Sequence, residues 1–269
     1  MDLDLQNLPD MEYQLMELVR QVPNGRVTTY GRLAEALGNP VAARWVGHFL
    51  RHHTHEPTCL CHRVVRAGGE LGAFVTGNID EKARLLRADE IEVAADRVDL
   101  DRFGFSDFVG EQPLDQLRDF QSQLKNELLL NYDGTSPNLI AGVDVSYSAN
   151  GDGVAAYALV DASSHDLVWS TTIRDAVRFP YITSYLAFRE LPLLVQLLNE
   201  AVGLSPPADV VIVDGSGVMH PRGAGIASQL GIVANIPTIG VTKKLLCGQV
   251  DLREMQPGEM RPVVIDGDR

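Results

Sequence analysis

The chain is poor in cysteine and aromatic residues, and it has no long apolar run. Three cysteines among 269 residues do not make a disulfide framework, which suits a reducing cytoplasm. Residues 1–4 are acidic and lack the apolar region of a signal peptide, and no segment reaches membrane-spanning length. These absences exclude the disulfide-rich secreted class and the membrane-spanning class, and they predict a cytoplasmic protein with no membrane partner.

Lysine is also scarce, and the formal net charge of −13 argues by itself against binding to nucleic acid. The distribution of charge argues the other way. Residues 20–66 hold seven arginines and five of the seven histidines against only two glutamates. A local basic face of this kind is what a DNA site needs. The alternative is a chance cluster of arginines.

The hydrophobic fraction of 45% and the charged fraction of 22% are those of a globular protein, and 269 residues suffice for two domains. The helical period is lost and glycines appear near residues 104–113. We therefore predict a first domain at 1–103, a linker at 104–113 and a second domain at 114–269.

The first domain carries the pattern of a helix-turn-helix. Thr28 or Thr29 can cap a helix that runs to about Leu37, and Gly38 can close it. Asn39 and a following proline then open a second helix over 41–51. Two short helices joined in this way predict a DNA-binding hairpin, although many helical hairpins look alike.

Three ordered motifs make this prediction specific: GRVTTYG at 25–31, NPVAAR at 39–44 and CHRVV at 61–65. They resemble the O6-alkylguanine-DNA alkyltransferases and their alkyltransferase-like relatives over residues 8–103. The resemblance implies a winged helix-turn-helix domain that binds double-stranded DNA containing O6-alkylguanine. It also implies that Cys61 accepts the alkyl group and that His62 takes the thiol proton through a water. Asp89 aligns with the carboxylate that holds the imidazole.

The same resemblance implies three DNA contacts. Tyr30 would press on the phosphate beside the lesion, and Arg44 would fill the gap left by the flipped base. Arg63 would be structural and lie near the DNA backbone. Leu60 stands where active members usually have proline, which leaves open a sensor that binds the lesion without removing the alkyl group.

Cys59 and Cys61, with histidines close by, raise the question of a zinc site. The single residue between these cysteines is unlike the usual gap of two to four residues, and no second pair follows. The sequence therefore predicts no structural metal here.

In the second domain, the apolar runs and helical periods follow in the order β-β-β-α-β-α-β, which matches an RNase H-like α/β fold. Asp144 and Asp214 each follow an apolar strand, and Glu190 lies in a helix pattern. Carboxylates at strand ends can converge on a hard divalent ion such as Mg²⁺. A single aspartate at a strand end is weak evidence, because such residues often cap loops.

Four motifs identify the family: AGVDVS at 141–146, PYITSYLAFRE at 180–190, VDGSG at 213–217 and PTIGVTK at 237–243. They resemble endonuclease V over about 115–250. The resemblance implies cleavage of DNA at the second phosphodiester 3′ to deoxyinosine, with inosine-containing RNA as an open alternative. It assigns Mg²⁺, or Mn²⁺ in its place, to Asp144, Glu190 and Asp214.

Further roles follow from the same resemblance. Tyr181 would be a wedge beside the lesion, Lys243 would stabilise charge on the phosphate, and Gly215 and His220 would lie around the flipped base. Family members continue past this point with a strand, a helix and a histidine that joins the metal site, so we expect the nuclease domain to be shortened at its C-terminus.

Together these features predict an α/β multidomain DNA repair enzyme, a monomer that combines alkyl transfer with cleavage at inosine. One alternative is a non-catalytic sensor of alkylguanine with an inactive nuclease domain. The other is a helix-turn-helix regulator of transcription, for which the sequence supplies no dimerisation segment.

Overall fold

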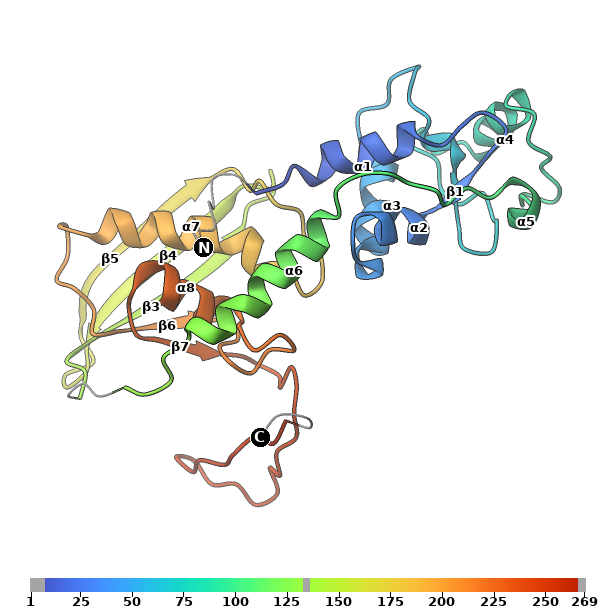
Figure 1. Cartoon of the computed structure of the whole chain (residues 1–269). Helices are drawn as coiled ribbons and strands as arrows, with labels where there is room; N and C mark the ends of the chain where they lie inside the picture. The colour runs from blue at the N-terminus through green and yellow to red at the C-terminus, as the bar shows by residue number, and fades with distance from the viewer. Residues whose placement is uncertain (1–7, 133–135, 266–269) are drawn as a thin grey trace. The chain divides into compact units, whose positions relative to one another are not determined.

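The computed structural model describes residues 8–132 and 136–265, and its contacts divide them into two compact units (Figure 1). We call residues 8–117 and 178–185 the helical unit, and residues 118–177 and 186–265 the sheet unit. The division falls inside a helix after residue 117, whereas the sequence suggests a linker at 104–113. The bounds 1–103 and 114–269 stay a prediction.

The helical unit contains six helices, of which the last continues into the sheet unit. They are α1 (Met11–Arg20), α2 (Tyr30–Ala36), α3 (Ala43–His52), α4 (Ile79–Ala88), α5 (Leu100–Phe103) and α6 (Pro113–Leu124). Two-residue strands β1 (Thr28–Thr29) and β2 (Val64–Val65) pair in parallel, and short 3-10 helices lie at η1 (Pro40–Ala42) and η2 (Cys61–Arg63). A third 3-10 helix, η3 (Lys125–Glu127), follows α6 in the sheet unit.

The predicted helix-turn-helix is present as α2, η1 and α3. The Thr29 hydroxyl accepts a hydrogen bond from the Arg32 amide at 3.1 Å, and the Asn39 side chain accepts one from the Val41 amide at 3.1 Å. These caps satisfy amides that have no partner inside a helix. Gly38 lies between the helices at φ +101°, a conformation that glycine adopts without strain. The second predicted helix opens as a 3-10 turn over its first residues.

The core of the helical unit lies under η2 and β2 and is built from side chains of several short segments. Its buried apolar members are Val27, Val65, Leu71, Ala83, Leu86, Ile91, Val98 and Phe103. Lys82 is almost fully buried beside them and donates hydrogen bonds to the carbonyls of Val64 and Leu71. These two bonds tie α4 to the segment that carries Cys61.

Residues 178–185 belong to the helical unit, although they lie far along the chain. The Tyr185 side chain is fully buried. Its hydroxyl donates to the Leu114 carbonyl at 2.9 Å and accepts from Asn39 Nδ2 at 2.9 Å. The segment that the sequence assigns to the second domain is therefore packed with residues of the helix-turn-helix region.

The sheet unit is built on a five-stranded mixed sheet of order β5-β4-β3-β6-β7. The strands are β3 (Leu139–Tyr147), β4 (Gly153–Asp161), β5 (Leu167–Asp175), β6 (Val210–Asp214) and β7 (Thr238–Val241). The first three are antiparallel neighbours, while β6 and β7 run parallel to β3. The predicted order β-β-β-α-β-α-β and the α/β fold class are confirmed.

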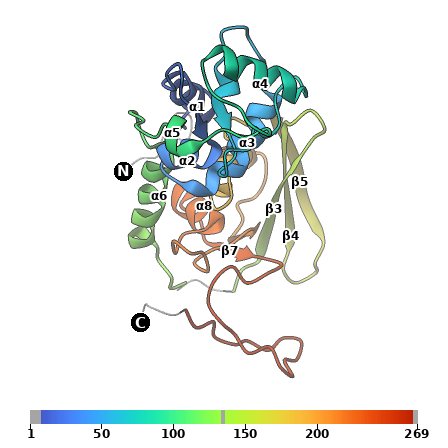
Figure 2. The same ribbon diagram turned by 90° about the vertical axis from the view of Figure 1, so that its right-hand side faces the viewer.

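Two helices cover one face of this sheet (Figure 1). Helix α7 (Leu186–Ala201) packs across β3, β4 and β5, and α8 (Ile226–Ala234) packs on β6 and β7. Figure 2 shows β3, β4 and β5 side by side. Alternate strand residues such as Val143, Ala155 and Val213 are buried against the helices, as the period of two predicts for a half-covered sheet. Pro192 lies inside α7, six residues after Leu186, the first residue of the helix.

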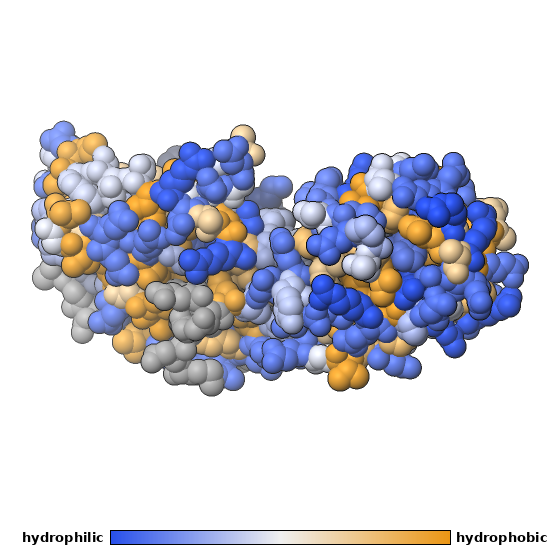
Figure 3. Space-filling model, turned by 90° about the horizontal axis from the view of Figure 1, so that it is seen from above, coloured by the Kyte–Doolittle hydropathy of each residue, from blue (hydrophilic) through white to orange (hydrophobic). Residues whose placement is uncertain are grey.

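The surface is mainly hydrophilic in the view of Figure 3, and its hydrophobic atoms appear in separate small groups. Among the described residues, no helix combines the length and the apolar character needed to cross a bilayer.

Candidate functional sites

Two of the three predicted metal ligands lie next to each other on the sheet. β3 and β6 pair in parallel, with Val143 opposite Val213. Asp144 and Asp214 follow these paired residues directly, and both are exposed whereas the valine before each is buried. Because side chains alternate along a strand, the two aspartates share one face of the sheet.

Glu190 comes from α7 and is buried, with 8% of its surface exposed. Burial, with a smaller contribution from the charges of Asp144 and Asp214, raises the pKa of this carboxyl to about 7. A hydrogen bond from the Tyr147 hydroxyl, 2.9 Å from Oε1, acts in the opposite direction. The three carboxylates thus act on one another electrostatically.

Tyr147 is a site residue that the sequence reasoning missed. It lies at the last position of β3, and the Arg189 guanidinium lies 4.4 Å from the centre of its ring. Burial, followed by the charge of Glu190, raises the pKa of Tyr147, so that its hydroxyl remains a donor. Tyr147 lies four residues after Val143, and this even spacing places it on the helix-covered face. That spacing is the signal that could have found it.

The donor set fits a hard divalent cation, because all three side chains offer carboxylate oxygens. The pKa of Glu190 is raised by burial and, to a smaller extent, by two other acids, and a cation placed among them would relieve the repulsion. Within the part of the chain that the structure describes, however, the carboxylate oxygens of these three residues do not lie close enough together to form a ready-made metal site.

A shallow groove of about 770 Å³ runs along the sheet beside Asp144. Small side chains line it because the residues in register with Asp144 and Gly142 are Ala156, Ala158, Ser170 and Thr172. The groove leaves the Asp144 carboxylate accessible from the face opposite α7.

Gly215 and Lys243, which the second resemblance also assigns, lie at this end of the sheet. The Gly215 amide donates to the Val241 carbonyl at 2.8 Å, and a Cβ at position 215 would lie 2.2 Å from a methyl of Ile226. Lys243 is exposed two residues beyond Val241, which pairs with Asp214.

His220 lies in the loop after β6, and its Nδ1 accepts a hydrogen bond from the Arg222 amide at 3.2 Å. Burial, and next the charge of Arg222, lower the pKa of His220 to about 4. Its imidazole is therefore neutral at pH 7. Tyr181, the predicted wedge, is 63% exposed within the part of the chain that belongs to the helical unit.

In the helical unit, Cys61 begins η2 and is buried, with 4% exposed. A hydrogen bond with Cys59 and burial raise the pKa of the Cys61 thiol. His62 Nε2 lies 3.0 Å from Asp89 Oδ2, as expected for the pair that follows the cysteine. Burial lowers the pKa of His62 against the opposing effect of Asp89.

Because Asp89 is a carboxylate, it accepts the Nε2 proton, which leaves Nδ1 as the acceptor nitrogen of the neutral ring. Nδ1 is buried and has no hydrogen-bond partner in the part of the chain that the structure describes. A neutral His62 ring held by Asp89 in this way can take up a proton at Nδ1.

Arg63 is buried, and its guanidinium is committed to protein groups. Its Nε donates to Asp89 Oδ2 at 2.6 Å, and its other nitrogens donate to the Val22 carbonyl at 2.7 Å and to Asn24 Oδ1 at 3.3 Å. The geometry gives Arg63 a structural task, and its DNA contact stays a prediction.

Tyr30 and Arg44 occupy the starts of the two helices of the helix-turn-helix. Tyr30 opens α2 and is half-buried, and burial raises the pKa of its hydroxyl. Arg44 is exposed in the first turn of α3. An exposed arginine at a helix start is free to reach a ligand outside the protein.

The structure also brings together four side chains that the sequence spacing did not favour as a metal site: His53, His55, Cys59 and Cys61. The one-residue gap between Cys59 and Cys61 was the ground for predicting no metal here. Two histidines that follow α3 turn back towards them, which a spacing rule for cysteine pairs does not detect.

Comparison with known proteins gives matches for both halves. The family model "Endonuclease V" matches residues 120–269, and "6-O-methylguanine DNA methyltransferase, DNA binding domain" matches residues 10–91. A bifunctional methyltransferase/endonuclease of Picrophilus torridus is 37% identical over 241 residues, covering 90% of this chain and 77% of the relative. A protein of the same description from Thermoplasma volcanium is 32% identical, covering 91% and 73%.

Among solved structures, the catalytic domain of human endonuclease V is 31% identical, with a TM-score of 0.46. That match covers 51% of this chain and 61% of the human chain, so the chain spans about three-fifths of the length of this neighbour.

Proposed function

Because the chain belongs to the two-domain family of bifunctional methyltransferase/endonucleases, which are DNA repair proteins, we propose that its sheet unit is an endonuclease acting at deoxyinosine in double-stranded DNA. The endonuclease V family is metal-dependent. The observation that carries the proposal is the adjacency of Asp144 and Asp214 on one sheet face, with their charges acting on the buried Glu190.

Asp144, Glu190 and Asp214 would hold Mg²⁺, with Mn²⁺ as the second candidate. The bound ion would supply an activated water and neutralise charge on the phosphate. The protein's own part is to orient the ligands: strand pairing sets the two aspartates, and the Tyr147 hydroxyl holds Glu190. The exposed Lys243 would meet the phosphate, and the neutral His220 and Gly215 would border the flipped base. Tyr181 would stack beside it.

A nicking assay on an end-labelled duplex with one deoxyinosine tests this function. We expect a nick at the second phosphodiester 3′ to the lesion with Mg²⁺, and none with EDTA. Glu190→Gln should abolish the nick, while Glu200→Gln, on an exposed position of the same helix, should not. No nick from folded protein with either metal would refute the proposal. The same assay on an inosine-containing RNA shows whether the protein cleaves DNA or RNA faster.

A second function has its own supporting observation, the 3.0 Å pairing of His62 with Asp89 directly after the buried Cys61. In the proposed reaction, the Cys61 thiol proton leaves through a water to His62. The sulfur then bonds to the alkyl carbon, the bond from that carbon to guanine O6 breaks, and its electron pair stays on the guanine, which is reprotonated. The product is a thioether on Cys61.

Tyr30 and the exposed Arg44 would rotate the alkylated nucleotide out and fill its place, acting on DNA as a monomer. The three cysteines of the chain are free thiols, and an acceptor thiol must stay reduced. We therefore place the protein in the reducing cytoplasm.

Intact-mass measurement after incubation with O6-methylguanine DNA tests this function. One methyl group per chain on Cys61 is expected, with none in Cys61→Ala and an unchanged yield in Cys247→Ser. If the wild-type protein binds the lesion and gains no methyl group, the sensor alternative replaces this proposal.

A further inference from the structure

Two histidines and two cysteines of the helical unit converge within one short loop. His53 ends α3 as its C-cap, His55 follows two residues later, and Cys59 and Cys61 lead into η2. Their ligand atoms all lie within 4.8 Å of one another. Four potential ligands within nine residues, and pointing at one another, form a more specific arrangement than a chance cluster of side chains.

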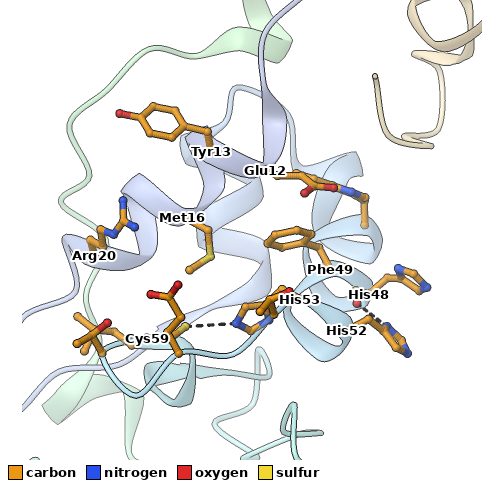
Figure 4. Close-up of a pocket in the computed structure, with 14 residues that line it drawn as sticks. Glu12, Tyr13, Met16, Arg20, His48, Phe49, His52, His53 and Cys59 are labelled. Carbon is orange, nitrogen blue, oxygen red and sulfur yellow. Dashed lines mark hydrogen bonds between the residues drawn. The ribbon is translucent and has the colours of Figure 1, made fainter. Parts of the chain in front are cut away.

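The individual contacts agree with the spacing of a tetrahedral site. His53 Nε2 lies 3.3 Å from Cys59 Sγ, and His55 Nδ1 lies 3.5 Å from Cys61 Sγ (Figure 4 draws the first of these contacts). Bonds of about 2.3 Å to sulfur and about 2.0 Å to nitrogen, at tetrahedral angles, separate two ligands by roughly 3.5 Å. A zinc ion would therefore need only small movements of these side chains.

The second nitrogen of His53 has the partner that metal-binding imidazoles use. His53 Nδ1 lies 3.1 Å from the Leu50 carbonyl, which can only accept, so Nδ1 carries the proton. Nε2 is then the unprotonated nitrogen, and it is the one that faces Cys59 Sγ. A ring oriented by a backbone carbonyl in this way has its free lone pair fixed towards a metal position.

The chemistry of the donors selects the ion. Two thiolates and two imidazoles make a borderline-soft set that suits Zn²⁺ and excludes Mg²⁺, which prefers oxygen. Burial favours closure, since Cys61 is 4% exposed and the other three side chains are half-buried. A cavity of about 660 Å³ between α1 and α3, lined in part by His53 and Cys59, gives solvent a route to the cluster (Figure 4).

From this geometry we propose that His53, His55, Cys59 and Cys61 bind one Zn²⁺ ion as a tetrahedral site, separate from the carboxylate site of the sheet unit. Binding replaces the two thiol protons, which leave to solvent, and closes the loop between α3 and η2. Metal binding does not depend on alkyl transfer to Cys61, so each proposal can fail while the other stands.

Co²⁺ is the probe for the first test, because it replaces zinc in tetrahedral sites and absorbs visibly. The full-length chain is reduced, stripped with EDTA, dialysed and titrated with Co²⁺. We expect one equivalent to produce a thiolate-to-cobalt charge-transfer band with tetrahedral ligand-field bands, and Zn²⁺ to remove both. A carboxylate site binds Co²⁺ without the thiolate band, so a titration without that band overturns the proposal.

Variants locate the site. Cys59→Ser and His53→Ala should weaken Co²⁺ binding at least about tenfold. Cys247→Ser, the thiol in the sheet unit, and His52→Ala, an exposed histidine of α3 outside the cluster, should leave it unchanged. A thiolate band that survives Cys59→Ser, or one that disappears in Cys247→Ser, contradicts the assignment.

A measurement on the wild-type protein avoids any variant that fails to fold. Iodoacetamide modification of each cysteine is followed by peptide mapping, with and without one equivalent of Zn²⁺. Zinc should slow modification of Cys59 and Cys61 at least about tenfold and leave Cys247 unaffected. Equal rates with and without zinc, or a disulfide between Cys59 and Cys61 under reducing conditions, would overturn the proposal.

Discussion

Replacement of Asp89 by asparagine is the sharpest test of how the Cys61 region is held. Asp89 Oδ2 accepts from Arg63 Nε at 2.6 Å and lies 3.0 Å from His62 Nε2. The side chains of Arg63 and Asp89 are 10% and 16% exposed. Asparagine keeps the shape of the residue but removes the charge that faces a nearly buried guanidinium.

Loss of one partner of a fully buried ion pair costs about 3–5 kcal/mol of folding free energy. Because Asp89 retains contact with solvent, we expect a smaller loss, about 2 kcal/mol, for Asp89→Asn. With a slope of roughly 1.5 kcal/mol per molar urea, the unfolding midpoint of the helical unit should fall by about 1.3 M.

The two tryptophans make this measurable in the full-length chain. Trp45 lies in α3 of the helical unit, and Trp169 lies in β5 of the sheet unit. In a Trp169→Phe background, fluorescence therefore reports unfolding of the helical unit alone. Glu90→Gln, an exposed carboxylate beside Asp89, is the matched control and should not move the midpoint.

The pH dependence supplies the second half of the test. Burial raises the pKa of Asp89, but hydrogen bonds from Arg63 and His62 outweigh it, so that the pKa lies below its usual value. A lowered carboxyl pKa contributes stability above the unfolded pKa, about 3.9, and this contribution is lost as the pH falls through the folded value. The difference between wild type and Asp89→Asn should therefore persist from pH 5 to 8 and shrink below about pH 4. Equal midpoints for Asp89→Asn and Glu90→Gln, or a difference that persists undiminished at about pH 2, would refute the reasoning.

Three further outcomes are expected. The folded pKa of His220 is lowered to about 4, so protonation of this histidine destabilises the sheet unit as the pH falls from 6.5 to 4. His220→Gln should therefore lose roughly 1–2 kcal/mol less stability than wild type over this range, measured by urea unfolding followed at Trp169. An identical pH profile in the variant contradicts this. Gly69→Ala should destabilise the helical unit by more than about 2 kcal/mol, because a Cβ there would clash with the Val98 carbonyl oxygen. Gly77 is also at positive φ but in open space, so Gly77→Ala should cost only about 1 kcal/mol. Equal losses in the two variants would exclude the clash. Tyr147→Phe should raise the Mg²⁺ concentration for half-maximal nicking about tenfold by removing the hydroxyl that holds Glu190, and an unchanged requirement would show that this contact does not support the ligand.

Local signals predicted much of the fold. The threonine and asparagine caps of the helix-turn-helix act within a few residues, and the alternation in β3 acts along one strand, so both can be read from short windows of sequence. The order of strands and helices then allowed few arrangements of the sheet unit.

Contacts between distant residues could not be read in this way. The hydrogen bond between Tyr147 and Glu190 joins residues 43 positions apart, and it depends on how α7 lies on the sheet. The burial of Tyr185 beside Leu114 joins residues 71 positions apart. Neither contact produces a periodic pattern in the sequence, so both became visible only in the folded structure.

The zinc question shows a different limit. A rule for the gap between two cysteines judges those residues alone, and it predicted no metal. The histidines reach the cluster because α3 ends at His52 and the chain turns back. The histidines come close to the cysteines because of where α3 ends, which the spacing between the cysteines does not reveal.

Pro192 in α7 gives the carboxylate site an uneven stiffness. Proline has no N–H to donate to the fourth residue before it, and its ring crowds that carbonyl, so the turn that carries Glu190 is more compliant than an ordinary helical turn. Asp144 and Asp214, in contrast, are paired in the sheet with Ala156 and Val241. Two of the three proposed ligands are thus held by strand pairing, and the third lies in a compliant helical turn. Glu190 alone could then follow changes in the size or position of a bound ion.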